Sequence, residues 1–233
     1  KLSDLKTCKV RREVPCGQGP IKFMIPLELK QSHAVPLCRL LSPFVDPQDG
    51  KALADLQTFE DSRQQALING MDSILVYLEQ LQMVSERFPL IIDDEEAGEG
   101  TIKVAWTWSN FTSPLAAATT SPTGLLASLR SNNHKKDPTL FSHYSLCFER
   151  LNHLLNLVIW FCRQAGQEQL ETVEGAKRAY QHLTKAAWLT EHLQRQELRG
   201  LRSLPPGSDL GQLAWLQAAC LAQAQACFIA KGQ

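Results

Sequence analysis

A helical pattern that fills the chain after Pro138 constrains the fold more than any other feature. Apolar residues recur there at intervals of three and four, the spacing of one face of an α-helix. The pattern predicts one helix over 140–164, a second that starts near Thr172, and a third that reaches Phe228. Because the breaks between these segments are short, neighbouring helices should be antiparallel. We therefore expect an antiparallel helical array in this half of the chain.

The composition of two of these helices indicates how they pack. In the first, the segment ERLNHLLNLVIWFC is apolar around most of its circumference, which predicts a central position in the array. The third follows the segment Leu204 to Gly207, whose two prolines and glycine should end the preceding helical pattern, and Ser208 or Asp209 is expected to cap its start. This helix is rich in alanine, and small residues over several turns let neighbouring helices approach closely.

The first thirty residues do not have a helical pattern. Residues 1–20 are polar and basic and contain several Gly and Pro residues, which is typical of an arm or linker. The stretch 21–30 is rich in β-forming residues but contains Pro26. Because proline cannot donate a hydrogen bond to a sheet, we expect an edge strand or a two-part strand there.

Two helices are predicted between this stretch and the middle of the chain. The apolar segment 37–44 is long enough for about two helical turns. A long helix is then predicted over 50–88, with Asn69–Gly70 as its weak point. It should end before Pro89, because the residue before a proline resists the α conformation.

Strict alternation of apolar and polar residues predicts one strand. In the sequence IKVAWTW, at 102–108, the alternation places Trp106 and Trp108 on one face, where they should cover a core. The segment 91–100 is acidic but lacks the spacing of a calcium loop, and we interpret it as a solvated loop. The segment 111–138 is expected to be a long loop. The predicted fold class is thus mainly α, an antiparallel helical array with a small N-terminal β-sheet.

The charge balance makes two classes of partner unfavourable. Lys+Arg and Asp+Glu both number 24, so the formal net charge is zero and predicts no bulk attraction to nucleic acid or to an acidic membrane. Small basic clusters at 135–136 and 195–202 lack interleaved aromatic residues, and we interpret them as solvated helix surfaces. The longest apolar run, 154–162, is too short to span a bilayer, and the N-terminus lacks the apolar core of a signal peptide. We therefore expect a cytoplasmic chain without a transmembrane segment.

Seven cysteines, an odd number, are scattered along the chain. No Cys-x-x-Cys or Cys/His pair has the spacing of zinc ligands. Those at 147, 162, 220 and 227 fall in apolar helical patterns, where a free thiol behaves as a small hydrophobic group. Cys8 and Cys16 flank a basic stretch and leave a metal or disulfide site open, although reduced thiols are favoured.

The sequence contains candidate catalytic groups but no catalytic constellation. It has no Gly-x-Ser-x-Gly, no phosphate-binding glycine loop and no His-Glu-x-x-His. His143 and His153 are predicted on related sides of one helix, and His182 and His192 on the next. Cys162 is expected in the core, because a reactive thiol needs an electropositive and partly exposed setting. We predict no catalytic residue, no cofactor site and no metal site, and hence a protein that is not an enzyme.

Several stretches carry a resemblance to a known family. They are IPLELKQS (25–32), LQMVSERFPL, VAWTWSNF, ERLNHLLN with Glu149 and Asn156, GAKRAYQHLTKAAWLTEHL and LAQAQACFIAKG (221–232). Together they resemble the Bro1-domain family, to which Alix, the His-domain phosphotyrosine phosphatase, Brox and the rhophilins belong. The resemblance covers residues 21–233 and implies the N-terminal two-thirds of a banana-shaped helical domain, with the C-terminal helices absent from this chain. Leu155 and Trp188 depart from the family pattern, so the chain resembles a divergent member.

The resemblance implies an adaptor or scaffold rather than a catalyst. Bro1 domains bind the C-terminal amphipathic helix of an ESCRT-III subunit of the Snf-seven type, which lays its apolar face on an exposed patch. It implies Phe228 as the patch aromatic and Lys231 as a cation for acidic side chains of the partner. The residues alone favour burial of Phe228 against a following helix. The implied setting is the cytoplasm, with recruitment to endosomes and peripheral membrane association but no cofactor.

Two other functions remain open within the same family. One is a rhophilin-like scaffold for small-GTPase signalling, which would act through flanking regions. The other is a structural component of a large assembly in which the ESCRT-III patch has been lost. Binding of an ESCRT-III helix peptide would separate the latter from the adaptor function.

Overall fold

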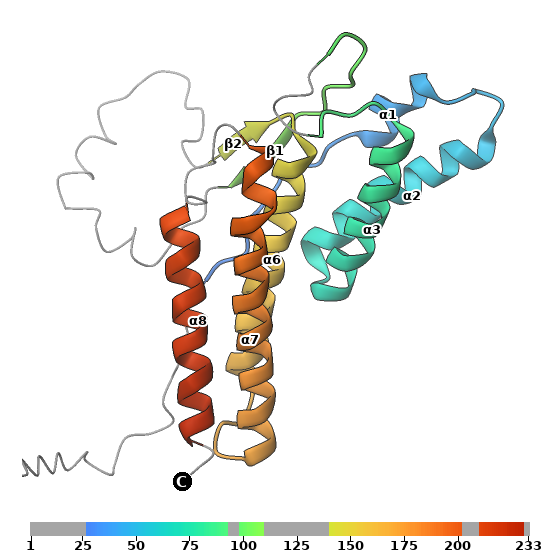
Figure 1. Ribbon diagram of the computed structural model, residues 1–233. Coiled ribbons are helices and arrows are strands. Elements are labelled where there is room, and N and C mark those ends of the chain that lie inside the picture. The colour runs from blue at the N-terminus through green and yellow to red at the C-terminus, as the bar shows by residue number, and fades with distance from the viewer. Residues whose placement is uncertain (1–26, 93–97, 110–139, 202–209, 231–233) are drawn as a thin grey trace, which may run out of the picture.

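An antiparallel row of helices forms the main body of the chain (Figure 1). The computed structural model describes residues 27–92, 98–109, 140–201 and 210–230. Within these residues the row consists of α6 (Leu146–Gln167), α7 (Val173–Arg195) and α8 (Leu210–Ala230). The middle helix, α7, packs against both α6 and α8. The mainly α fold class and the antiparallel array are confirmed.

The predicted start of α7 at Thr172 is confirmed and has a local cause. The Thr172 hydroxyl oxygen accepts a hydrogen bond of 3.0 Å from the backbone N–H of Gly175, which caps the helix. Gly175 has no room for a side chain, since a Cβ there would lie 1.9 Å from the Gln169 carbonyl oxygen. The chain therefore turns tightly between α6 and α7 and brings them together.

The prediction that a helix begins at residue 140 is wrong. Leu140–His143 forms a strand, β2, and α6 begins at Leu146. Ser145 separates them, because its hydroxyl accepts from the Cys147 N–H and donates to the Ile92 carbonyl oxygen, at 3.1 and 2.7 Å. A short apolar run has the same pattern in a strand and in a helix, and the pairing partner decides between them.

That partner is β1 (Trp106–Ser109), which pairs with β2 in antiparallel register from Trp106–His143 to Ser109–Leu140. The predicted alternation is confirmed, because every second side chain from Ile102 onward is buried. The exposed fraction is 1% for Trp106 and 0% for Trp108. The strand thus covers the core with both indoles, as expected.

The single helix predicted over 50–88 is wrong, because it is two helices, α2 (Gly50–Ile68) and α3 (Met71–Arg87). They separate at the Asn69–Gly70 pair. Gly70 has a φ of 91°, which favours glycine, and a Cβ there would lie 3.2 Å from the Trp160 ring. The chain therefore reverses at Gly70, and α3 packs against both α2 and α6. As predicted, α3 ends before Pro89.

The segment before α2 contains the predicted short helix but not the predicted strand. Residues 37–44 form α1 (Leu37–Leu41) followed by a 3-10 turn, η1 (Ser42–Phe44). Residues 27–30 have no regular secondary structure, so the strand predicted at 21–30 is wrong for them. The backbone at Lys30 is instead bonded to a side chain of α6, while Gln31 accepts a 2.8 Å bond from the Ser109 N–H.

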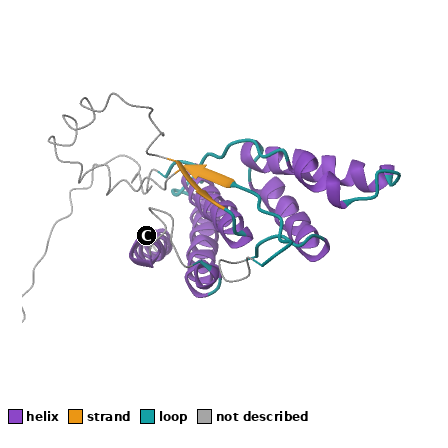
Figure 2. Ribbon diagram, turned by 90° about the horizontal axis from the view of Figure 1, so that it is seen from above, coloured by secondary structure: helices purple, strands orange, loops and turns teal. Residues whose placement is uncertain are grey.

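The view from above shows the two-stranded sheet over one end of the row and α2 and α3 to one side of it (Figure 2). The central position predicted for α6 is confirmed, because Leu151, Leu155, Val158 and Ile159 are all 0% exposed. Along the described parts of the chain, no helix is long and apolar enough to cross a membrane.

Several predictions concern segments outside the described residues. These are the basic arm at 1–20 with Cys8 and Cys16, the first part of the strand at 21–30, most of the acidic segment at 91–100, the loop at 111–138, and the cap at Ser208 or Asp209. They remain predictions.

Candidate functional site

The outermost helix of the row, α8, contains no charged residue along its whole length. Its inward side is buried and faces α6 and α7 through Leu213, Leu216, Cys220, Ala224 and Cys227. Its opposite side, here called the α8 outer face, is exposed and mostly apolar: Leu210, Ala214, Ala218, Leu221, Ala222, Phe228 and Ile229, with the polar Gln225 among them. Helices at a protein surface normally carry polar groups on the side that faces water. An uncharged outer face is therefore typical of a surface that another element or another protein covers.

Phe228, the partner-binding residue implied by the family resemblance, lies on this face. Its exposed fraction is 65%, and that of the neighbouring Ile229 is also 65%. The Phe228 ring contacts Tyr180 of α7, with ring centroids 6.3 Å apart. Phe228 is thus exposed in this chain, where the residues alone favoured burial. Lys231, the other implied residue, lies outside the described residues.

A second cluster of functional groups surrounds Glu149, near the start of α6. The carboxylate is 0% exposed and lies 2.8 Å from the Arg63 Nε. It also accepts hydrogen bonds from the Tyr77 hydroxyl at 3.1 Å and the Trp108 indole N–H at 2.6 Å. The remaining partner of the carboxylate is His153, whose Nε2 lies 3.1 Å from the Glu149 Oε1. These groups come from α2, α3, β1 and α6, so the cluster joins four elements.

The charges of this Glu149 cluster form a buried ion pair between Glu149 and Arg63. Burial by itself would raise the pKa of Glu149, but the Arg63 guanidinium and the contact with His153 together outweigh it and hold that pKa at about 2. Burial lowers the pKa of His153, so this imidazole stays neutral at neutral pH. Its Nε2 must then carry the proton, because an ionised carboxylate can only accept.

Arg63 ties the cluster to the segment before α1. Its Nη1 donates to the His33 carbonyl oxygen at 2.9 Å, and its Nη2 donates to the Ser32 hydroxyl at 2.7 Å. The guanidinium also lies 5.5 Å from the Trp106 ring centroid. Each of the three guanidinium nitrogens of Arg63 is thus engaged inside the protein. The cluster holds elements in place, and the buried Nδ1 of His153 is its one side-chain atom without a hydrogen-bond partner among the described residues.

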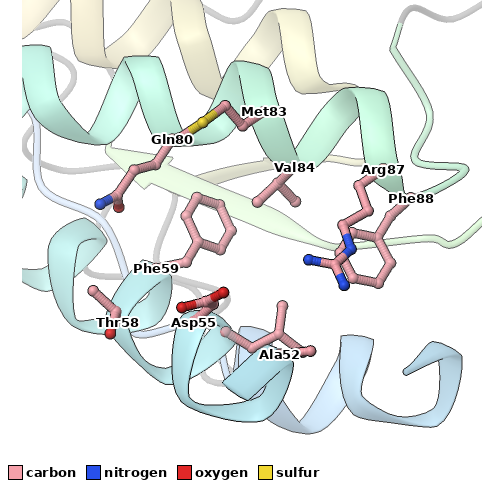
Figure 3. Close-up of a pocket in the computed structure, with 10 residues that line it drawn as sticks. Ala52, Asp55, Thr58, Phe59, Gln80, Met83, Val84, Arg87 and Phe88 are labelled. Atoms are coloured by element: carbon pink, nitrogen blue, oxygen red, sulfur yellow. The ribbon is translucent and has the colours of Figure 1, made fainter. Parts of the chain in front are cut away.

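A cavity of about 330 Å³ lies between α2 and α3. Figure 3 shows Asp55 and Arg87 at this cavity, with Phe59, Val84 and Phe88 forming its apolar walls. Thr58 carries the single hydroxyl group among the lining residues, and it donates to the Ala54 carbonyl oxygen of its own helix. No histidine or cysteine lines the cavity. It therefore has space for an apolar side chain, and the one carboxylate among its lining residues is that of Asp55.

The histidines and cysteines that we weighed as catalytic candidates do not converge. His143 lies in β2 and not on a helix with His153, so the predicted pairing on one helix is wrong. Cys162 is buried as predicted, with its sulfur 3.6 Å from that of Cys220. This contact, together with burial, raises the pKa of Cys162, so the thiol stays protonated. In the part of the chain that the structure describes, no three His, Cys, Asp or Glu side chains are placed to hold a metal ion.

Sequence reasoning missed most of the Glu149 cluster. It identified Glu149 and Trp108 separately, by family resemblance and by alternation, but not their contact. One signal was available for Arg63, which falls in helical register with the buried residues Leu56, Phe59 and Ala66 of α2. A charged residue on the buried side of a helix predicts a buried partner.

Comparisons with known proteins agree with this architecture. The model of the BRO1-like domain family matches residues 24–232. The pH-response regulator protein palA/RIM20 of Aspergillus oryzae is 25% identical over 216 residues, which cover 88% of this chain and 22% of that protein. The chain thus spans less than two-thirds of the length of this relative.

Solved structures share the fold at low sequence identity. The ALIX BRO1 CHMP4C complex matches with a TM-score of 0.70 and 21% identity, covering 90% of this chain and 56% of that chain. The structure of ALIX with the SIVmac239 PYKEVTEDL late domain matches with a TM-score of 0.67 and 20% identity, covering 89% of this chain and 29% of that chain.

Proposed function

This chain belongs to the BRO1-like domain family, and we propose that it is a non-enzymatic adaptor that binds a partner helix on the α8 outer face. The proposed partner is the C-terminal amphipathic helix of an ESCRT-III subunit of the Snf-seven type. The observation that carries the proposal is the 65% exposure of both Phe228 and Ile229 on a helix without charges. A partner helix that lays its apolar side there would remove both side chains from water.

The chemistry of the face supports a helix as the occupant. The exposed apolar residues of α8 recur at helical spacing from Leu210 to Ile229 and form a row that Gln225 interrupts between Ala222 and Phe228. Such a row is complementary to the apolar stripe of a second helix packed alongside. Lys231, four residues beyond Cys227 in the sequence, would meet an acidic residue of the partner. One of the structures that this chain resembles is itself a complex of the ALIX BRO1 domain with CHMP4C.

The proposal extends to domain organisation and location. We assign residues 1–20 to a linker or arm and 21–233 to the N-terminal two-thirds of the domain. An adaptor of this kind would act in the cytoplasm and be recruited to endosomes by its partner, without a cofactor.

A peptide titration tests the adaptor function. The full chain is titrated with a synthetic ESCRT-III C-terminal helix, and binding is measured by calorimetry. We expect Phe228→Asp to weaken binding at least about ten-fold, because a carboxylate would have to be buried under the partner's apolar side. A matched control is Ile68→Asp at the end of α2, where the side chain is 72% exposed and far from α8 in the chain.

The control should bind as the unmodified chain does, and neither variant should change the thermal unfolding midpoint by much. Equal binding by Phe228→Asp and the unmodified chain would show that the α8 outer face is not the site. Absence of any binding by the unmodified chain would instead favour a structural component or a rhophilin-like scaffold.

A further inference from the structure

A cavity of about 650 Å³ lies where the segment before α1 passes the last turns of α2 and the second half of α6. It is lined by residues 28–32, by Leu67 of α2 and by Arg163 of α6. None of these lining residues belongs to α8, so the cavity does not share residues with the proposed partner surface. Two of the lining residues, Lys30 and Arg163, are cations that come from different elements.

Lys30 is fixed in position and almost completely buried. Its backbone N–H donates to the Asn156 Oδ1 at 2.7 Å, and its carbonyl oxygen accepts from the Asn156 Nδ2 at 2.9 Å. The residue is 4% exposed. Among the described residues its ammonium group has no carboxylate within ion-pair distance and no hydrogen-bond partner. Burial lowers the pKa of Lys30 to about 7.

A buried lysine without a counter-charge nearby favours its neutral form, because an ammonium removed from water needs a counter-charge or polar partners. A residue that simply filled this position could be apolar. A bound anion would supply the missing counter-charge and stabilise the charged form of Lys30. The cavity that Lys30 lines is the route by which such a counter-charge would arrive.

Arg163 provides the second positive charge. Its Nη2 donates to the Leu27 carbonyl oxygen at 3.2 Å, and its guanidinium lies 5.9 Å from the Trp160 ring centroid. No described carboxylate lies within ion-pair distance of it. Glu28 is the one acidic residue among those that line the cavity, and it is exposed and makes no ion pair with either cation. Arg163 is thus a fixed cation at the cavity, and Lys30 adds a second positive charge when it is protonated.

We propose that this cavity binds a small phosphorylated anion, with Lys30 and Arg163 as its charged ligands. A phosphoryl group carries close to two negative charges at neutral pH and so matches two cations. Arginine presents a planar fork of donors to its oxygens, and lysine adds a point charge. The volume lies in the range of small-molecule sites. Because Lys30 is so deeply buried, a free small molecule fits better than a headgroup held in a bilayer.

Inorganic phosphate is the probe that tests this site. The full chain is titrated with phosphate, with ionic strength held constant by sodium chloride, and the thermal unfolding midpoint and calorimetric affinity are measured. We expect saturable binding, an increase in the midpoint, and at least a ten-fold loss of affinity in Lys30→Met, which keeps the apolar stem without the charge. Arg163→Gln should also weaken binding. Lys51→Met, at an exposed lysine on α2, should bind as the unmodified chain does.

Several outcomes would overturn the proposal. One is a midpoint that responds to phosphate no more than to chloride, and another is equal phosphate affinity in Lys30→Met and the unmodified chain. Should Lys30→Met fail to fold, Arg163→Gln decides in its place, and unchanged affinity in that variant rejects the site. Sedimentation with anionic vesicles separates the two sources of phosphate. Lys30-dependent vesicle binding without a response to free phosphate would reject a small molecule as the ligand.

Discussion

Replacing Glu149 with leucine should destabilise the chain severely, because it leaves Arg63 charged and unpaired in the core. Both side chains are 0% exposed and their closest atoms are 2.8 Å apart. Removal of one partner of a buried ion pair costs about 3–5 kcal/mol, since the remaining charge has lost its counter-charge and cannot reach water. The indole N–H of Trp108 and the hydroxyl of Tyr77 lose their acceptor as well. Domains of ordinary stability have about 5–15 kcal/mol in total, so a large fraction would be lost.

The measurement is the free energy of unfolding from urea denaturation, followed by tryptophan fluorescence. Arg178→Ala is the matched control, because it breaks an ion pair of the same 2.8 Å length in which the arginine side chain is 55% exposed. Exposed pairs contribute about 0–1 kcal/mol, so this control should remain close to the unmodified chain. Because the two ion pairs have the same length, the difference in free energy of unfolding between the two variants reports the effect of burial and not of distance.

A double variant tests the reasoning itself. Arg63→Met combined with Glu149→Leu removes both charges, so it should be considerably more stable than the sum of the two single losses predicts. The reasoning is refuted if Glu149→Leu loses less than about 1 kcal/mol, or if the two single losses simply add in the double variant. Either result would mean that water reaches the Arg63 guanidinium once Glu149 has been replaced.

Two further predictions concern acid and a tight turn. The folded-state pKa of Glu149, at about 2, is below its ordinary 4.5, so the stability that it contributes is present above about pH 4.5 and should be lost as the pH falls toward 2. Urea midpoints measured across this window check it, and Glu149→Leu should lack this part of the acid dependence. Gly175→Ala should lower the free energy of unfolding by about 1–3 kcal/mol, because its Cβ would lie 1.9 Å from a backbone oxygen. Gly50→Ala, where a Cβ meets nothing within 4 Å, should leave the unfolding midpoint unchanged or slightly higher, and a drop at Gly50 equal to that at Gly175 would contradict the packing argument.

The features that sequence could predict are those with local causes. Thr172 caps α7 because its hydroxyl accepts a hydrogen bond from the N–H of Gly175, three residues later. Pro89 ends α3 because a proline restricts the backbone of the residue directly before it. The burial of Trp106 and Trp108 follows from alternation within a single strand. In each case the information lies within a few residues of the feature.

The features that sequence could not predict depend on contacts between distant residues. Residues 140–143 are a strand because β1 is available as a partner, and the run alone does not show it. Gly70 had been identified as a weak point, but a full reversal of the chain requires α3 to pack back against α2. The burial of Lys30 could not be predicted, since its backbone is held by Asn156, 126 residues away. Exposure of Phe228 likewise depends on which other elements reach α8.

Stability and binding should be separable in this chain, because the two depend on different elements. The Glu149 cluster joins α2, α3, β1 and α6, whereas the proposed partner surface lies on α8 and contacts α7 through the Phe228–Tyr180 pair. Mutations at distant sites without shared partners usually have additive effects on the free energy. Arg178→Ala, which alters an exposed ion pair, should therefore leave the affinity for an ESCRT-III helix unchanged, and Phe228→Asp should leave the urea midpoint unchanged. A chain in which Phe228→Asp lowered both affinity and urea midpoint would show that this side chain supports the fold, and the proposed docking surface would have to be abandoned.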